Sequence, residues 1–374
     1  MSMKISTITC HNVYNHGALL QAWALATYLS DIGHDCSIID YQPDYLTGHY
    51  DFKINNKKYD RPLLRWIYLL FKYPSWRKSL QRKNNFDSFF NRNIRPLLTA
   101  RKYSSIEELR QNPPNADVYI AGSDQIWNTF VQNGNDASFY LDFGNNTIKK
   151  ISYAASFSTE IILNSSFNFV KEQLKKFNRI SVRETSGINI LNDLGLTGSV
   201  VSDPVFLIDR EKWEAVMTPI NISKKYILIY DTKKSKDLAI LAKRMSKIMG
   251  MPIYSISGFN LPYAKNKYRM GGPDIFLSLV KNAECVISNS FHATAFSIIF
   301  NRDFIVVKRP DGLNKRMEDL LSAYDLSSRL MSATEDYDRL CSHIDYSLIQ
   351  RRIRGFRVES EKWLQESLNG NEVN

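Results

Sequence analysis

The sequence lacks the features of several large protein classes. Its 374 residues include only four cysteines, which are widely spaced and form no C-x-x-C pair. We therefore expect reduced core cysteines, and neither a disulfide framework nor a zinc ribbon. No apolar run approaches the ~18 residues that span a membrane, and the N-terminus shows no signal-peptide pattern. Both absences predict a cytoplasmic protein.

Common catalytic motifs are absent as well. The chain has no G-x-G-x-x-G loop, Walker loop, G-x-S-x-G turn or H-E-x-x-H helix. This argues against a dinucleotide-binding enzyme, a P-loop NTPase, an α/β-hydrolase and a zinc protease. The run Asp336-Tyr337-Asp338 matches the D-x-D of metal-dependent glycosyltransferases, but so short a match in a polar segment often arises by chance. We expect neither a metal nor a cofactor in the site.

Positive charge is what the chain has in excess, with a formal net charge of +11. Residues 53–83 hold ten Lys and Arg against one acid, Asp60, so their balance is 10 − 1 = +9. Trp, Tyr and Leu lie between these charges, a composition typical of a helix on an anionic membrane surface. No nucleic-acid-binding motif accompanies it, so we expect no nucleic acid partner. The alternative to membrane binding is a helical hairpin that packs on its own domain.

Strand-like and helix-like segments alternate in two series, one beginning at residue 4 and one at residue 226. Such alternation predicts parallel sheets with helices on both faces. We expect an α/β protein with two Rossmann-like domains that face a cleft. The predicted domains are residues 1–205, with the basic insertion 53–83, and residues 206–374. A charged amphipathic helix at 346–368 is placed so that it can cross back to the first domain.

Polar side chains follow several predicted strands at their carboxyl ends, the edge where open α/β sheets bind ligands. Asn15 and Gln21 lie near the first loop and suit a ligand there. The alternative is a self-bonded turn at Asn15 and a solvent-facing side chain at Gln21. Asp124 follows the strand 118–121 and suits a base or a hydroxyl ligand; an Asx turn is the alternative. Arg183 ends another strand and suits an anion clamp, unless it forms a surface pair with Glu184.

His292 follows the most informative pattern. A short strand stops at Ser288-Asn289-Ser290, and an apolar segment of helical length follows from Ala293. The pattern predicts a histidine at a helix start, where free backbone N–H groups attract anions and an imidazole can move protons. The alternative is a capping or packing residue.

Five motifs follow one another along the chain: NHGALLQAWA (15–24), GSDQIWN (122–128), ISYAAS (151–156), ISVRE (180–184) and SNSFHAT (288–294). In this order they resemble the polysaccharide pyruvyl transferase family, over residues 4–330. The resemblance implies a glycosyltransferase-B-like fold and phosphoenolpyruvate as donor substrate. It also implies transfer of the enolpyruvyl group onto a sugar of a capsular or exopolysaccharide precursor, as a cyclic ketal, with release of phosphate. Galactose is the sugar that we favour.

The resemblance assigns roles to the donor side of the site. His292 becomes the catalytic acid/base, Arg183 the ligand of the donor anion, and Phe291 a wall of the donor pocket. Some members of the family have Arg where this chain has Ser290. We expect Arg316 or Arg309, which follow the strand 304–307, to supply the missing charge.

The acceptor side and the location follow in the same way. Asp124 is the second catalytic candidate and an acceptor ligand, together with Asn15 and Gln21. Because such glycans are often built on a polyprenyl diphosphate, the resemblance implies a lipid-linked acceptor. It also implies a peripheral enzyme at the inner face of the cytoplasmic membrane, held there by residues 53–83. Two alternatives stay open, a nucleotide-sugar-dependent glycosyltransferase of the same shape and a non-catalytic membrane-surface scaffold of capsule assembly.

Overall fold

The structure is a computed structural model that describes residues 2–47, 62–309, 314–334 and 342–370. Two predictions therefore lie partly or wholly outside the described residues. These are the first part of the basic segment, residues 53–61, and the D-x-D run at 336–338.

The first half of the chain forms a five-stranded parallel sheet in the order β3-β2-β1-β4-β5. Its strands and helices are β1 (Lys4–Ile8), α1 (His16–Asp31), β2 (Asp35–Tyr41), β3 (Leu98–Tyr103), α3 (Ile106–Gln111), β4 (Val118–Ala121), β5 (Lys149–Ser152), α4 (Phe167–Leu174) and α5 (Thr185–Asp193). Both faces of β1 are buried, because neighbouring residues of a strand point to opposite faces of the sheet. Ile5 packs in the core that includes α1, and Ile8 packs in the core on the other side. The sheet is therefore covered on both faces, as the apolar strands predict. A two-stranded pair, β6 (Ser181–Val182) and β7 (Ser199–Val200), extends this half.

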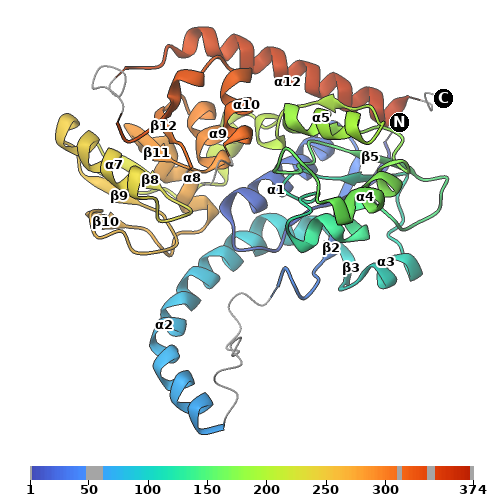
Figure 1. Cartoon of the computed structure of the whole chain (residues 1–374), viewed down its shortest axis with the longest axis horizontal. Coiled ribbons are helices and arrows are strands. Elements are labelled where there is room, and N and C mark those ends of the chain that lie inside the picture. Colours follow the sequence, from blue (N-terminus) through green and yellow to red (C-terminus); the bar gives the residue numbers. More distant parts are fainter. Residues whose placement is uncertain (1, 48–61, 310–313, 335–341, 371–374) are drawn as a thin grey trace.

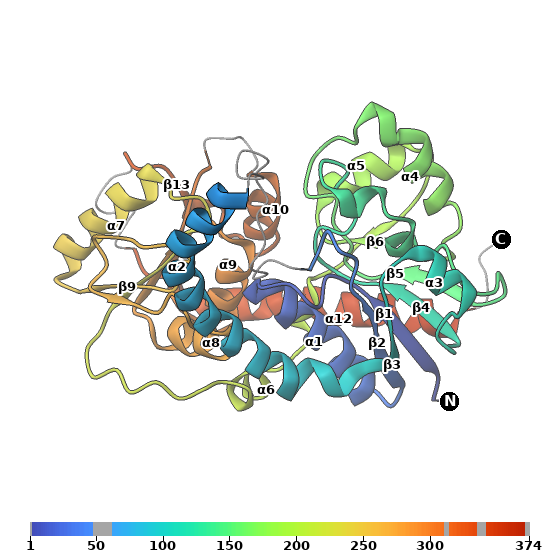
Figure 2. The same ribbon diagram turned by 90° about the horizontal axis from the view of Figure 1, so that it is seen from below.

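The second half forms a six-stranded parallel sheet in the order β10-β9-β8-β11-β12-β13. It contains β8 (Ile227–Tyr230), α7 (Lys236–Met249), β9 (Ile253–Ser255), β10 (Asn266–Lys267), α8 (Pro273–Asn282), β11 (Cys285–Ser288), α9 (Phe291–Ile299), β12 (Asp303–Val307), α10 (Lys315–Ala323) and β13 (Leu330–Met331). A short helix, α6 (Arg210–Ala215), precedes it. Figure 2 shows the two halves side by side. The expected α/β fold with two facing parallel sheets is confirmed, while the domain boundary at 205/206 stays a prediction.

The final helix, α12 (Tyr346–Asn369), runs along both halves and ends near the N-terminus (Figure 1). At its start the Tyr346 hydroxyl donates to the Arg302 carbonyl of the second half (2.6 Å). Further along, the Ser202 amide donates to the Ser360 hydroxyl (2.9 Å). At its end Lys149 of β5 donates to the Leu368 carbonyl (2.8 Å). The predicted crossing back to the first half is therefore confirmed.

Helix α1 also joins the two halves. His16, at its first turn, is fully buried, and its ring nitrogens lie 3.1 Å from the Tyr230 hydroxyl and 3.1 Å from the Gly271 carbonyl, both of the second half. Because the Gly271 carbonyl can only accept, Nε2 carries the hydrogen and Nδ1 accepts from Tyr230. Burial lowers the pKa of His16 well below its ordinary value, so the ring is neutral at pH 7. The contact fixes Tyr230, which lines the cleft described below.

Helix α2 (Pro62–Phe89) carries the described part of the basic segment and extends away from both sheets (Figure 1). Its C-terminal part packs on the second half, where Arg82 donates to the Arg269 carbonyl (2.8 Å) and Asn85 to the Met270 carbonyl (2.6 Å). The segment therefore includes one long helix, not the hairpin of the alternative, over its described residues. Among the helices of the described chain, none is long and apolar enough to cross a membrane.

Candidate active site

A cleft of about 950 Å³ lies between the two halves. Its lining comes from the segments that follow β1, β4 and β5 on one side, and from those that follow β8, β11 and β12 on the other. These loops leave the carboxyl ends of parallel strands, where such sheets bind ligands. The lining residues are Asn15, Asp124, Gln125, Asn128, Phe130, Val131, Ser158, Thr159, Glu160, Ile161, Tyr230, Thr232, Lys233, Asn289, Ser290, Phe291, His292, Arg309, Lys315 and Arg316.

His292 sits where the N-termini of α9 and α1 meet. It is the second residue of α9, is 8% exposed and lines the cleft. Gly17 of α1 lies directly against its ring, because a Cβ added at Gly17 would stand 2.0 Å from Nδ1. Ser290, at the N-cap of α9, makes no side-chain capping bond, so no side chain competes with a ligand for that helix end. The histidine is therefore not a helix cap, and it lies at a helix start whose backbone N–H groups suit an anion.

A buried carboxylate stands behind this histidine. Asp203 Oδ2 lies 3.7 Å from His292 Nε2 and accepts hydrogen bonds from Arg183 Nη1 (2.7 Å) and the Ser123 hydroxyl (3.1 Å). Burial alone would raise the pKa of Asp203, but the charges of His292 and Arg183 lower it overall. Burial lowers the pKa of His292, and the attraction of Asp203 offsets this only in part. At neutral pH the site thus holds a neutral imidazole beside an ionised carboxylate.

Arg183 occupies a different place from the predicted one. It does not line the cleft; its guanidinium packs on the far side of the Phe291 ring, 4.3 Å from the ring centroid, and bonds Asp203. Its pair with Glu184 (Nε–Oε2, 3.5 Å) is buried, so the alternative of a surface pair is wrong. Within the described chain, Nε and Nη2 of Arg183 have no hydrogen-bond partner. The arginine therefore holds Asp203 and Phe291 in place behind the cleft wall.

Asp203 is the site residue that sequence reasoning missed. It follows β7 and accepts from the Val205 amide (3.1 Å) at the start of a 3-10 helix, Pro204–Phe206. A carboxylate before proline at the end of a strand is common at such turns, so the residue carried no signal of its own. Only the fold brings it to Arg183 and His292.

Positive side chains on the second half line the cleft opposite the first half: Lys233, Arg309, Lys315 and Arg316. With the Gln125 amide turned so that its oxygen accepts, both terminal nitrogens of Arg316 bond that oxygen, at 2.8 and 3.0 Å. Burial and the nearby Arg183 charge lower the pKa of Arg316 to about 10, so it stays protonated at neutral pH. Arg309 and Arg316 thus line the same cleft as Ser290, and their role as the replacement charge stays a prediction.

The predicted acceptor residues divide between the cleft and the interior. Asp124 lines the cleft, and its backbone adopts a positive φ of 83°, which is uncommon for a residue other than glycine. Asn15 also lines it, but its side-chain oxygen caps α1 by accepting from the amides of Gly17 (2.9 Å) and Ala18 (3.3 Å). Gln21 lies away from the cleft and is fully buried, donating to the Thr9 hydroxyl (2.9 Å).

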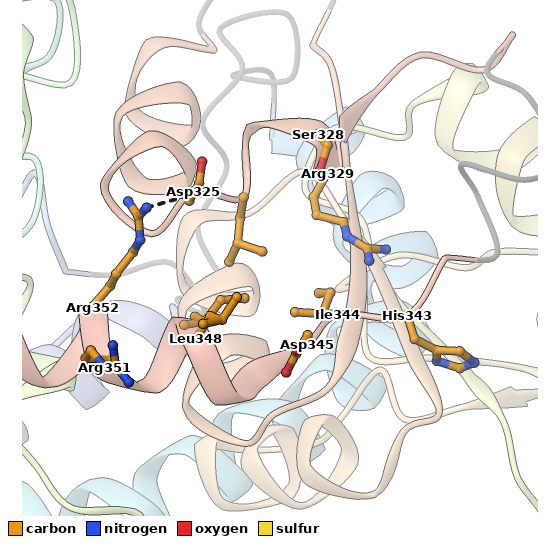
Figure 3. Close-up of a pocket in the computed structure, with 11 residues that line it drawn as sticks. Asp325, Ser328, Arg329, His343, Ile344, Asp345, Leu348, Arg351 and Arg352 are labelled. Carbon is orange, nitrogen blue, oxygen red and sulfur yellow. Dashed lines mark hydrogen bonds and ion pairs between the residues drawn. The ribbon is translucent and has the colours of Figure 1, made fainter.

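A smaller cavity of about 430 Å³ lies beneath the start of α12 (Figure 3). Three of its lining side chains are already paired, Arg352 with Asp325 (3.1 Å) and His343 with Asp303 of β12. Its lining residues do not come from the loops at the carboxyl ends of β1, β4, β8 or β11, so we place the active site in the larger cleft. Among the residues that the structure describes, no three His, Cys, Asp or Glu side chains gather as they do around a metal ion.

Two parallel sheets that meet at a cleft along their carboxyl edges define a glycosyltransferase-B-like α/β protein. The complex of S. aureus MnaA with UDP shares this fold, with a TM-score of 0.50 and 11% identity over 97% of this chain and 95% of that one. Lower TM-scores are found with UDP-N-acetylglucosamine 2-epimerases. That of Rickettsia bellii gives 0.42, with 13% identity over 98% and 99% of the chains, and that of Neisseria meningitidis bound to UDP-GlcNAc gives 0.44, with 10% over 97% and 100%.

The sequence identifies the particular family within this class. Residues 15–311 match the family of polysaccharide pyruvyl transferases, a span that includes all five motifs and nearly the whole cleft. The chain therefore belongs to the polysaccharide pyruvyl transferase family, as its motifs predict. No match to the chain is found among curated proteins.

Proposed function

We propose that the protein moves the enolpyruvyl group of phosphoenolpyruvate onto two hydroxyls of a sugar, as a cyclic ketal, and releases phosphate. The sugar, for which galactose is our first candidate, would belong to a capsular or exopolysaccharide precursor. The observation that carries the proposal is the position of His292. A neutral histidine backed by an ionised carboxylate lies at an uncapped helix N-terminus in a cationic cleft. Membership of the pyruvyl transferase family supports it.

The cationic wall suits a donor with two anionic groups. Phosphoenolpyruvate carries a phosphate and a carboxylate, and Arg309, Lys315 and Arg316 offer three positive groups on one side of the cleft. Arginine binds such planar or tetrahedral oxyanions through paired hydrogen bonds. The start of α9 adds backbone N–H groups at the same place. Phe291 separates this donor position from Arg183 and keeps the Arg183–Asp203 pair away from the ligand.

The first bond forms by a proton relay. Phosphoenolpyruvate is an enol phosphate, so its methylene carbon can accept a proton, which leaves an oxocarbenium-like centre at C2. The neutral imidazole of His292 takes the proton of an acceptor hydroxyl and gives it to that methylene carbon, while the hydroxyl oxygen bonds to C2. Asp203, 3.7 Å away, stabilises the imidazolium between the two transfers.

The second bond closes the ketal. Another hydroxyl of the same sugar attacks C2, the bond from C2 to the phosphate oxygen breaks, and the second proton leaves with the phosphate. Asp124 lines the cleft on the acceptor side and is our candidate for orienting this hydroxyl. The products are a pyruvate ketal and inorganic phosphate, with no redox change and no cofactor consumed.

The test is a reaction of phosphoenolpyruvate with lipid-linked acceptors that end in galactose, glucose or mannose, read by mass spectrometry. The expected result is one carboxyethylidene group on an acceptor and one phosphate released. A nucleotide-sugar glycosyltransferase would instead be protected from heat by a UDP- or GDP-sugar and not by phosphoenolpyruvate. A scaffold would bind partners without any turnover. Either result would refute the proposal.

A further inference from the structure

The two walls of the cleft differ in charge. All lining Lys and Arg side chains belong to the second half: Lys233, Arg309, Lys315 and Arg316. The lining residues of the first half include two acids, Asp124 and Glu160, and no Lys or Arg. An anionic donor is attracted to the second wall and repelled by the first. The first wall is thus left for a partner without negative charge.

The first wall also exposes apolar surface at the mouth of the cleft. Among the side chains whose exposure the structure describes, seven large apolar ones are exposed, and three of them line this wall: Phe130 (50% exposed), Val131 (46%) and Ile161 (65%). Such side chains are costly to leave in water, and gathered beside a cleft they mark a binding surface. We call these three residues the apolar platform.

The apolar platform is held rigidly by the loops after β4 and β5. The Phe130 amide donates to the Asn128 side chain (3.0 Å), and the Leu163 amide donates to the Thr129 hydroxyl (3.1 Å), which ties the two loops together. Glu184, buried beneath them, accepts from the Ser158 amide (3.2 Å). A surface fixed in this way binds its ligand with little loss of entropy.

Polar groups are interleaved with the apolar platform. Asn128, Ser158 and Thr159 line the same wall between its apolar members. The Asn128 side-chain oxygen accepts from Phe130, and the Thr159 hydroxyl donates to the Phe157 and Ile161 carbonyls, so both hold the loops in shape. A pyranose ring has an apolar face of C–H groups and a rim of hydroxyls that can bond the remaining polar atoms of this wall, which a lipid chain cannot do. The mixture of one aromatic ring and several hydrogen-bonding groups matches the ring, not the lipid.

We infer that the apolar platform is the acceptor subsite and that it holds an uncharged pyranose ring stacked on Phe130. This inference rests on the proposed function and extends it, because it separates a donor wall on the second half from an acceptor wall on the first. The acids of the first wall make a uronic acid or a phosphorylated sugar a poor ligand here.

The test measures sugar binding directly, by ligand-detected NMR with methyl β-galactoside, methyl β-glucoside and methyl α-mannoside. Phe130→Ala should weaken binding of the sugar about tenfold, the effect of losing some 55 Å² of apolar contact. Phe130→Tyr, which keeps the ring, should bind as the wild type does. The same Phe130→Ala protein should bind phosphoenolpyruvate unchanged, whereas Arg316→Gln should weaken phosphoenolpyruvate and leave the sugar unaffected.

Val358→Ala is the control, since Val358 is also an exposed apolar residue (60%) but lies on α12 and does not line the cleft. Equal sugar binding by wild type and Phe130→Ala, or no sugar binding by the wild type, would overturn the inference. Tighter binding of methyl galacturonate than of methyl galactoside would also overturn it. Because NMR reports binding without turnover, failure of the transfer reaction would count against the proposed function alone.

Discussion

Replacing Gly17 with alanine should disable the enzyme although it removes no catalytic group. A Cβ at Gly17 would lie 2.0 Å from Nδ1 of His292, whereas ordinary contacts begin near 3.4 Å. The imidazole must then retreat by about 3.4 − 2.0 = 1.4 Å. Because a misplacement of about 1 Å can cost ~10²-fold in rate, and general acid–base catalysis contributes ~10²–10⁴-fold, we expect kcat to fall by at least ~10²-fold.

The assay is phosphoenolpyruvate-dependent phosphate release, with the free energy of unfolding measured by denaturant titration. Crowding of this kind costs about 1–3 kcal/mol, so the variant should fold and still bind phosphoenolpyruvate. Gly355→Ala is the matched control, because nothing lies within 4 Å of a Cβ there and the residue is inside α12. It should keep full turnover and gain about 0.5–1 kcal/mol of stability. Turnover of Gly17→Ala within a few-fold of wild type would refute the placement of His292.

Three further predictions concern charge. Asp203→Asn breaks a buried pair with Arg183. The substitution should lower the free energy of unfolding by about 3–5 kcal/mol and should also lower kcat. A loss of stability below ~1 kcal/mol in denaturant titration would contradict this prediction. Burial lowers the pKa of His292, and the imidazole acts first as a base. We therefore expect kcat/KM to be constant at neutral pH and to decrease only below pH ~6.5. A kcat/KM that already decreases while the pH is lowered towards 7 would contradict this prediction. The free energy of unfolding should also decrease as the pH drops through that range, because the histidine of the unfolded chain binds its proton first. The protein should float with anionic vesicles at low salt and be released by high salt, because residues 53–83 hold +9 of its net charge of +11. Protein that stays unbound at low salt would contradict the peripheral location.

Much of the fold could be predicted because its signals are local. The strands 118–121 and 285–288 are short apolar runs bounded by polar loops, and helix α7 ends at Gly250, whose positive φ suits glycine. The elements that were missed carry weaker local patterns, such as β13 (two residues) and the six-residue α6. These form because neighbouring strands and helices provide partners, which periodicity does not reveal.

The site could be predicted in part, for the same physical reason. His292 and Asp124 follow strands of two different sheets, and both lie at the carboxyl edge of their own sheet. Because these two edges face one cleft, both residues line it as expected. Arg183 follows such a strand too, but its direction depends on the buried carboxylate of Asp203, a partner twenty positions away that no local pattern marks. Gln21 shows the opposite case: its place near the first loop predicts an acceptor ligand, or else a solvent-facing side chain. Both are wrong, because the residue is buried and bonds Thr9 in the interior.

The measurement that tests the account most directly compares wild type with His292→Ala in phosphoenolpyruvate-dependent phosphate release, using an acceptor that the wild type converts. Both proteins must first show the same fold by circular dichroism and the same protection from heat by phosphoenolpyruvate. The account predicts that the variant binds the donor but loses at least ~10²-fold in turnover. Near-normal phosphate release by the folded variant would contradict it.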